Sequence, residues 1–249
     1  MKKLLTASLA VTMALGVSAA AVAAPVRNVV LVHGAFADGS GWRAVSDILE
    51  RDGYTVSIVQ EPETSLADDA AATKRVIQQV NAPLVLVGHS YGGAVITQAG
   101  DQPQVHALVY IAAFQPDNGE TLGGLLQKMP PAANNAVPAG EGYVIVDPKK
   151  FHADFAADLP AKEAGFMAIS QVPISTSGFG TPIAGAAWHA KPSWYAVATQ
   201  DRMINPDLER FMAKRAGSTT VEIKGSHAIY MSQPAAVAKL IEQAAKGAK

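Results

Sequence analysis

The segment 88–93, Gly-His-Ser-Tyr-Gly-Gly, places a serine among small residues directly after the apolar run 84–87. A strand that ends in G-x-S-x-G and continues into a helix turns so tightly that the serine hydroxyl is exposed. Bulkier residues at the glycines would collide with the neighbouring strand and helix. Because residues 94–99 have the composition of such a helix, we interpret Ser90 as the nucleophile of an acyl-transfer reaction. The alternative is a glycine-rich structural turn.

A serine hydroxyl becomes a good nucleophile only when a base takes its proton, and histidine is suited to that task near neutral pH. His227 lies in the turn 224–228, directly after an expected strand at 220–223. This position puts it at the same sheet edge as Ser90, so we predict that His227 is the base. The alternative is a solvated loop histidine.

The base in turn needs a carboxylate that holds its tautomer and stabilises the imidazolium. Asp201 follows an expected strand at 194–198 and gives the chain order Ser, Asp, His. It is therefore the predicted acid, the alternative being that it only pairs with Arg202. Asp117, after the expected strand 105–111, is the rival acid.

An oxyanion hole is the third requirement, and each of its N–H donors typically lowers the barrier by ~3–4 kcal/mol. The backbone N–H of Tyr91 is one expected donor, because the tight turn fixes its direction. The other is expected in the loop 33–36, His-Gly-Ala-Phe, which follows the apolar run 29–32. We predict that Ala35 supplies this N–H, with Phe36 as the alternative.

The remaining histidines show no spacing typical of a metal site. We expect His33 to bond within its own loop and His89 to pack beside the serine turn. The other three are expected on the surface or in the inserted segment described next, namely His106, His152 and His189. The chain has no H-E-x-x-H or C-x-x-C motif, and no G-x-G-x-x-G follows a strand. The sequence therefore predicts no metal and no nucleotide cofactor.

Strands and helices alternate along most of the chain, which predicts an α/β fold: a mostly parallel sheet of about six strands with helices on both faces. Between about 115 and 190 the alternation breaks into a stretch rich in Pro, Gly and Ala, with helical fragments at 120–128, 149–157 and 160–169. We expect this insertion, placed before the last two strands, to form a helical cap over the carboxyl ends of the strands. The alternative is an irregular excursion without a functional role.

The N-terminus has the features of an export signal. Lys2 and Lys3 precede an uncharged, apolar stretch that ends in a cluster of small residues. We therefore predict a signal peptide at 1–24 and one domain at 25–249, located in the periplasm or secreted. The alternative is an uncleaved membrane anchor. The chain has no cysteine, which excludes disulfides and a lipid-modified N-terminus.

The composition also limits the partners. The formal net charge of −1 becomes −3 when the two lysines are removed with the signal, and no run of Lys and Arg exceeds two residues. Nucleic acid is therefore not an expected partner. After signal cleavage we expect no stable membrane association, and the oligomeric state is not predicted.

With these pieces in place, the chain resembles the α/β-hydrolase superfamily, and it is similar to the small serine esterases that group with plant methylesterases and hydroxynitrile lyases. The matching motifs are Val-Leu-Val-His-Gly-Ala at 30–35, Gly-His-Ser-Tyr-Gly-Gly at 88–93, Asp201-Arg202 with Asn205-Pro206, and Ser226-His227 with Ser232-Gln233-Pro234. They span nearly all of the chain after the signal, whereas the cap supplies no matching motif. The resemblance implies a serine esterase site beneath a cap, and a sheet without the first two strands of longer relatives.

Two positions depart from the lyases of that group. Hydroxynitrile lyases carry a lysine just after the catalytic histidine and a threonine in place of the glycine of the oxyanion loop. Here those positions are Ala228 and Gly34. The cation that would stabilise departing cyanide is absent, which favours ester hydrolysis over cyanohydrin cleavage.

The expected reaction is hydrolysis of a small neutral carboxylic ester through an acyl-enzyme on Ser90, with His227 moving the protons. The cap sequence is largely apolar and holds no obvious cluster of Arg or Lys that would grip an anionic substrate. Alternatives on the same residues are a hydroxynitrile lyase-like reaction, perhydrolysis and lactone opening. A ligand-binding protein without turnover is a further alternative.

Overall fold

The computed structural model describes residues 26–248 and contains a six-stranded sheet in which every strand runs parallel to its neighbours. The strand order is β2-β1-β3-β4-β8-β9. The strands are β1 (Asn28–Val32), β2 (Thr55–Val59), β3 (Leu84–His89), β4 (Val105–Ile111), β8 (Ser193–Ala198) and β9 (Thr219–Ile223). The predicted α/β fold with about six strands is confirmed.

The central strands are buried on both faces, as their uninterrupted apolar sequences require. Every residue of β3 and of β8 is buried, and β4 has only His106 partly exposed. A parallel strand covered by helices on both faces has no solvent side, so it reads as a continuous apolar run. This packing fixes the carboxyl end of β3, where Ser90 follows.

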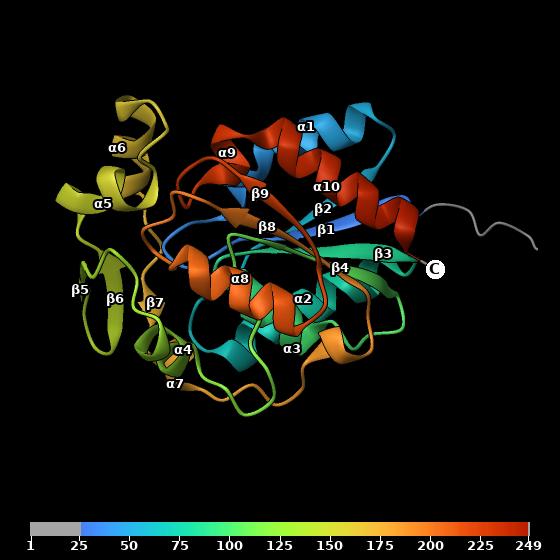
Figure 1. Cartoon of the computed structure of the whole chain (residues 1–249), viewed down its shortest axis with the longest axis horizontal. Helices are drawn as coiled ribbons and strands as arrows, with labels where there is room; N and C mark the ends of the chain where they lie inside the picture. The colour runs from blue at the N-terminus through green and yellow to red at the C-terminus, as the bar shows by residue number, and fades with distance from the viewer. Residues whose placement is uncertain (1–25, 249) are drawn as a thin grey trace, which may run out of the picture.

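Helices cover both faces of the sheet, as predicted (Figure 1). One face carries α1 (Arg43–Arg51) and α10 (Pro234–Gly247), with the short α9 (Ile229–Ser232) beside them. The other face carries α2 (Leu66–Val80), α3 (Gly92–Ala99) and α8 (Pro206–Arg215). A short 3-10 turn, η1 (Gly39–Trp42), leads into α1.

Local sequence signals explain where these helices begin and end. The Ser65 hydroxyl accepts a hydrogen bond from the Asp68 N–H at 3.1 Å and so caps α2. Gly53, with φ at 84°, follows α1 and allows the chain to turn into β2. Asn205 caps α8, whose first residue is Pro206.

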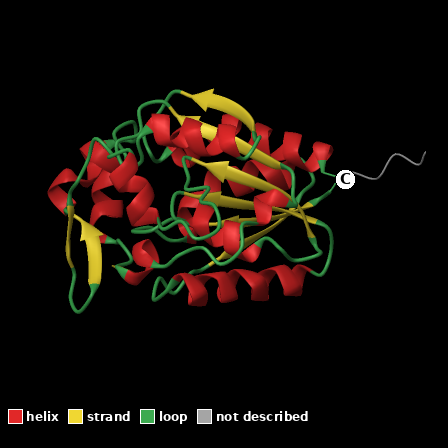
Figure 2. Ribbon diagram, turned by 60° about the horizontal axis from the view of Figure 1, so that its bottom comes forward, coloured by secondary structure: helices red, strands yellow, loops and turns green. Residues whose placement is uncertain are grey.

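A large insertion lies between β4 and β8 and projects beyond the carboxyl ends of the strands (Figures 1 and 2). Its elements are α4 (Leu122–Lys128), β5 (Ala136–Pro138), β6 (Tyr143–Val146), α5 (Pro148–Phe155), α6 (Ala161–Ile169), β7 (Ile174–Ser175), α7 (Ser177–Gly180) and η2 (Ala187–His189). The three expected helical fragments are present as α4, α5 and α6. The small antiparallel sheet β5-β6-β7 was not predicted, because strands of two to four residues are too short to show a period in the sequence.

The predicted signal peptide, 1–24, lies outside the described residues. Within residues 26–248, none of the helices has both the length and the apolar character that crossing a membrane requires.

Candidate active site

Ser90 occupies the tight turn between β3 and α3. Its φ is 52°, a left-handed backbone conformation that is strained for a residue with a side chain. Side chains at the flanking glycines are excluded, since a Cβ on Gly88 would clash with the Gly92 carbonyl and one on Gly92 with the His33 carbonyl. The two glycines thus allow the close packing that forces the serine outward, at the carboxyl edge of the sheet.

His227 and Asp201 are in direct contact although they lie 26 positions apart. The distance from His227 Nδ1 to Asp201 Oδ2 is 2.5 Å, and both side chains are buried. The other carboxylate oxygen, Oδ1, accepts the N–H groups of Met203 at 2.7 Å and Ile204 at 2.9 Å. Two backbone donors therefore hold the carboxylate in place while it orients the imidazole, which leaves Nε2 for proton transfer.

The rival acid lies elsewhere. Asp117 Oδ1 is 2.7 Å from His189 Nε2, and its side chain is one-third exposed. The His189 ring stacks on Trp188 with centroids 3.9 Å apart. Asp117 is thus engaged with a histidine of the insertion rather than with His227.

Ser90 and His227 line one cavity of about 310 Å³. The Ser90 hydroxyl makes no hydrogen bond to another residue within 26–248, so the serine–histidine contact is not closed in this structure. In free enzymes such contacts are often long and tighten when substrate binds.

The expected oxyanion donors lie at the same cavity. Ala35 and Phe36 line it, and Tyr91 directly follows Ser90. Neither the Ala35 N–H nor the Tyr91 N–H donates to another group among the residues that the structure describes. The Phe36 N–H faces the Glu63 carboxyl and acts to lower the pKa of that group, against the larger effect of burial. The Glu63 oxygens make no hydrogen bond within the described residues, so Ala35 stays the predicted second donor and Phe36 its alternative.

The cavity is apolar apart from its catalytic edge. Most of its wall comes from the insertion and includes Leu126, Val144 and Phe179. The polar exceptions are Asn134, Asn135 and Thr176, and no Lys, Arg, Asp or Glu lines it. Such a wall suits an uncharged group of modest size.

Two buried carboxyl groups, those of Glu61 and Glu63, lie behind the oxyanion loop. Nothing in the sequence indicated them. His33, Glu61 and Glu63 have ligand atoms within 4.8 Å of one another, the spacing of a possible metal site. The His33 Nε2 accepts the Glu61 N–H at 3.0 Å, so its Nδ1 carries the proton and faces the Gly34 carbonyl at 3.1 Å. A ring in this tautomer has no lone pair to offer a metal at Nδ1. His33 instead joins its loop to the segment after β2, which agrees with its predicted structural role.

Burial raises the pKa of Glu63 to about 9, and it raises that of Glu61 well above the usual range. Asp69 adds to both shifts through charge repulsion. Asp69 also accepts the Tyr91 hydroxyl at 2.7 Å. Asp69, beside these two glutamates, therefore anchors Tyr91, whose N–H is an expected oxyanion donor.

His89 packs beside the turn, as expected, and its Nε2 donates to the His227 carbonyl at 2.9 Å. The ring centroids of His89 and His227 are 4.7 Å apart. Burial lowers the pKa of His89 well below the usual value, which keeps it neutral. His89 thus supports the His227 loop from below.

A contact from the insertion supports the same loop and had no signal in the sequence. Asp158, in the turn between α5 and α6, accepts the Ser226 N–H at 3.0 Å and the Ser232 hydroxyl at 2.8 Å. The Ala228 N–H donates to the Phe155 carbonyl at 3.1 Å. Both neighbours of His227 in the chain are therefore tied to the insertion.

Comparison with known proteins gives consistent matches. The model of the alpha/beta hydrolase family matches residues 29–240. The chain is 28% identical over 235 residues to the carbendazim hydrolyzing esterase of Nocardioides sp. (strain SG-4G), a match that covers 83% of this chain and 95% of that protein. It is 27% identical over 246 residues to the pyrethroid hydrolase of Sphingobium wenxiniae, covering 87% and 86%.

Solved structures agree at the level of the fold. Polyneuridine aldehyde esterase superposes with a TM-score of 0.75 at 18% identity, covering 87% of this chain and 98% of that one. A pyrethroid hydrolase from Sphingobium faniae JZ-2 superposes with a TM-score of 0.74 at 24% identity, covering 88% and 96%.

Proposed function

This chain belongs to the alpha/beta hydrolase family, and from that premise we propose that it hydrolyses carboxylic esters by a serine-dependent mechanism. The observation that carries the proposal is the His227–Asp201 contact of 2.5 Å at the cavity that Ser90 lines. The names of its relatives, the carbendazim hydrolyzing esterase and the pyrethroid hydrolase, point to the same class of reaction.

In the first step the Ser90 oxygen attacks the ester carbonyl carbon while His227 takes the hydroxyl proton. The negative charge that develops on the carbonyl oxygen is stabilised by the N–H groups of Tyr91 and Ala35. When the bond to the alcohol oxygen breaks, His227 gives that oxygen the proton. Asp201 stabilises the imidazolium throughout.

In the second step water attacks the acyl group on Ser90. His227 takes a proton from the water and returns it to the serine oxygen as the acid leaves. The same two N–H donors stabilise the second tetrahedral intermediate, so one set of residues serves both half-reactions.

We propose that the acyl group is small and uncharged. The 310 Å³ cavity lacks Lys, Arg, Asp and Glu among its lining residues. A charged acyl group would lose its hydration there without gaining a partner.

The lyase alternative is disfavoured by local space and charge. A Cβ on Gly34 would lie 2.6 Å from Ser90 Cβ and 2.9 Å from His89 Nδ1, so the backbone as it stands has no room for a threonine. The residue after His227 is Ala228, which is fully buried and carries no cation. These positions support hydrolysis rather than cyanohydrin cleavage.

Hydrolysis of p-nitrophenyl esters from acetate to decanoate tests the proposal. Activity that peaks at short acyl chains is expected for a cavity of this size. An absence of activity on every ester of the series would contradict it, and release of aldehyde from mandelonitrile would then favour the lyase alternative.

We also propose that the mature protein is exported after cleavage near residue 24, on the strength of the basic and apolar N-terminal sequence. Intact mass measurement of the protein purified from the periplasm or culture medium tests this. A full-length mass in the membrane fraction would contradict it and favour the anchor.

A further inference from the structure

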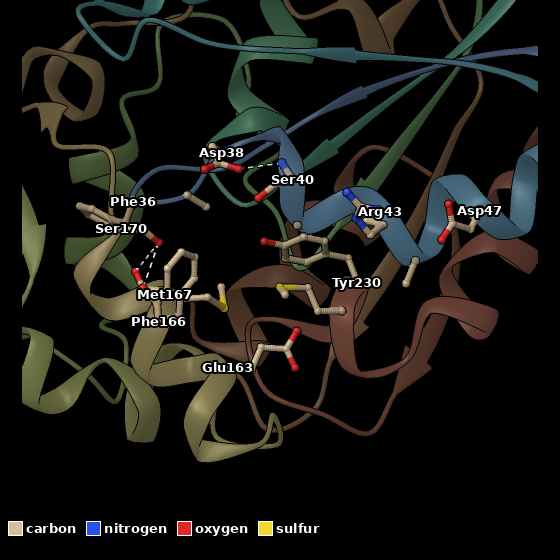
Figure 3. Close-up of a pocket in the computed structure, with 14 residues that line it drawn as sticks. Phe36, Asp38, Ser40, Arg43, Asp47, Glu163, Phe166, Met167, Ser170 and Tyr230 are labelled. Atoms are coloured by element: carbon tan, nitrogen blue, oxygen red, sulfur yellow. Dashed lines mark hydrogen bonds between the residues drawn. The ribbon is translucent and has the colours of Figure 1, made fainter.

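A second cavity, of about 510 Å³, lies beside the one that contains Ser90 (Figure 3). It is a groove between α6 of the insertion on one side and η1 and α1 on the other. Its volume is within the range of small-molecule sites. The mechanism above makes no use of it.

Phe36 connects the groove to the catalytic cavity, because it lines both. Its backbone has φ at 68°, a left-handed conformation, within the oxyanion loop. Tyr230 and Met231, which closely follow His227 in the chain, form another wall of the groove. The groove is therefore lined by residues of the oxyanion loop and of the segment that directly follows His227.

The charged side chains of the groove are mostly acidic. Asp38, Asp47 and Glu163 line it, and Arg43 is the only cationic side chain among its lining residues. Among residues 26–248, none of these four forms an ion pair within 4.0 Å. Figure 3 shows the Glu163 carboxylate directed from α6 toward the Tyr230 side of the groove. The three carboxylates and one guanidinium that line the groove thus leave an excess of two negative charges, and the Asp38 carboxylate also accepts the Ser40 N–H at 2.7 Å.

The remaining wall is aromatic and thioether in character. Phe166 is 68% exposed, an unusual position for a large apolar side chain, and Met167 lies beside it on α6. Tyr230 is fully buried, and its hydroxyl has no hydrogen-bond partner within the described part of the chain. The hydroxyl lies on the groove side of the ring (Figure 3), packed against Gly41, where an added Cβ would be 2.7 Å from it. Carboxylates combined with aromatic faces and thioethers are the chemistry that holds an organic ammonium group.

We propose that this groove binds the alcohol half of an ester whose alcohol carries an ammonium group, while the uncharged acyl half lies in the Ser90 cavity. The proposal rests on the ester hydrolysis argued above and names its substrate class. This substrate differs from the neutral ester that the sequence predicts, because the carboxylates of Asp38, Asp47 and Glu163 come together only in the folded chain.

A matched pair of esters tests the charge alone. Acetylcholine and 3,3-dimethylbutyl acetate have the same shape, but only the first carries a positive charge. We expect kcat/KM to be about tenfold higher for the cationic ester at low salt, the order of a carboxylate–aromatic cation site. The preference should shrink as sodium chloride is added, because the Asp47 and Glu163 side chains are exposed to solvent.

Two substitutions should change the ratio of kcat/KM for acetylcholine to kcat/KM for 3,3-dimethylbutyl acetate in opposite directions. Glu163→Gln removes an anionic side chain and should lower the cationic preference about threefold, whereas Arg43→Gln removes the cation and should raise it about threefold. The control is Glu141→Gln, an exposed glutamate in the β5–β6 turn that lines neither cavity. It should leave the ratio unchanged.

Hydrolysis of p-nitrophenyl acetate separates the two proposals. The groove proposal is wrong if 3,3-dimethylbutyl acetate is hydrolysed as fast as acetylcholine or faster. It is also wrong if neither Glu163→Gln nor Arg43→Gln changes the ratio of the two kcat/KM values. If p-nitrophenyl acetate is hydrolysed but neither acetylcholine nor 3,3-dimethylbutyl acetate is, the groove proposal is also wrong, while the proposed ester hydrolysis stands. If no ester is cleaved, both the proposed ester hydrolysis and the proposed ammonium site are contradicted.

Discussion

Asp158 accepts hydrogen bonds from both the amide and the hydroxyl of Ser226, at 3.0 and 2.5 Å, so the turn between α5 and α6 is tied to the loop that carries His227. Gly225 permits this approach, since a Cβ there would lie 2.7 Å from Asp158 Oδ2. Partial burial raises the pKa of Asp158, but its hydrogen bonds from Ser226 and Ser232 lower it below the usual value overall. The insertion thus helps to set the position of the catalytic histidine.

Asp158→Asn removes the charge that holds Ser226 and should let the imidazole drift. We expect kcat to fall about tenfold with little change in KM, because a misplaced base affects the chemical step more than binding. Steady-state kinetics on p-nitrophenyl acetate checks this. The loss in the double variant with Ser226→Ala should be smaller than the two single losses combined, since the two substitutions share the Asp158–Ser226 contact although the Ser226 hydroxyl also bonds the Phe155 carbonyl. Additive losses, or a loss confined to KM, would contradict a positioning role.

Asp201→Asn and Asp117→Asn discriminate between the two candidate acids. Asp201 accepts from His227, so its amide variant should lose about 10³–10⁴-fold in kcat by favouring the wrong tautomer. Asp117 contacts His189 instead, and its variant should keep near wild-type activity. The reverse ranking of the two variants would show that the acid is misassigned.

Glu63→Gln should stabilise the protein in alkaline solution. Burial raises the Glu63 pKa from 4.5 to about 9, so wild-type stability is fully present below pH 4.5 and is lost as the pH rises toward 9. Glutamine stays neutral throughout, so its advantage should grow over this range to at least ~1 kcal/mol, or about 2–4 °C in unfolding temperature, near pH 8. Thermal unfolding at pH 5 and pH 8 measures it, with Glu141→Gln as the exposed control. An equal difference at both pH values would contradict the shift.

Gly34→Ala tests how closely the oxyanion loop approaches the nucleophile. The added Cβ would lie 2.6 Å from Ser90 Cβ, so the loop must move and carry the Ala35 N–H out of place. We expect kcat to fall about 10²-fold, the loss of one oxyanion donor. Gly165→Ala, with nothing within 4 Å of its new Cβ, is the matched control and should retain activity. Full activity in Gly34→Ala would mean that this loop is not the donor.

The sheet and the neighbourhood of Ser90 could be predicted because each candidate residue follows a buried strand. Parallel strands end at one edge, so local signals at β3, β8 and β9 bring Ser90, Asp201 and His227 together there. Asp201 and Asp117 both follow strands, and only the packing of the folded chain puts Asp201 rather than Asp117 against His227.

The insertion could be predicted only in part. Its helices have periodic sequences, whereas β5 and β7 are too short to show any. The Asp158–Ser226 contact joins residues 68 positions apart and depends on how the insertion docks. The buried Glu61 and Glu63 looked like ordinary loop residues, since nothing local shows that the chain after β2 runs beneath the oxyanion loop.

The central claim is that Ser90 forms the acyl-enzyme, and trapping that adduct tests it most directly. The mature protein is treated with a fluorophosphonate ester, and the labelled peptide is identified by mass spectrometry. We predict one adduct, on Ser90, together with loss of ester hydrolysis, and neither adduct nor hydrolysis in Ser90→Ala. An adduct on another residue, or hydrolysis that persists in correctly folded Ser90→Ala, would contradict the account.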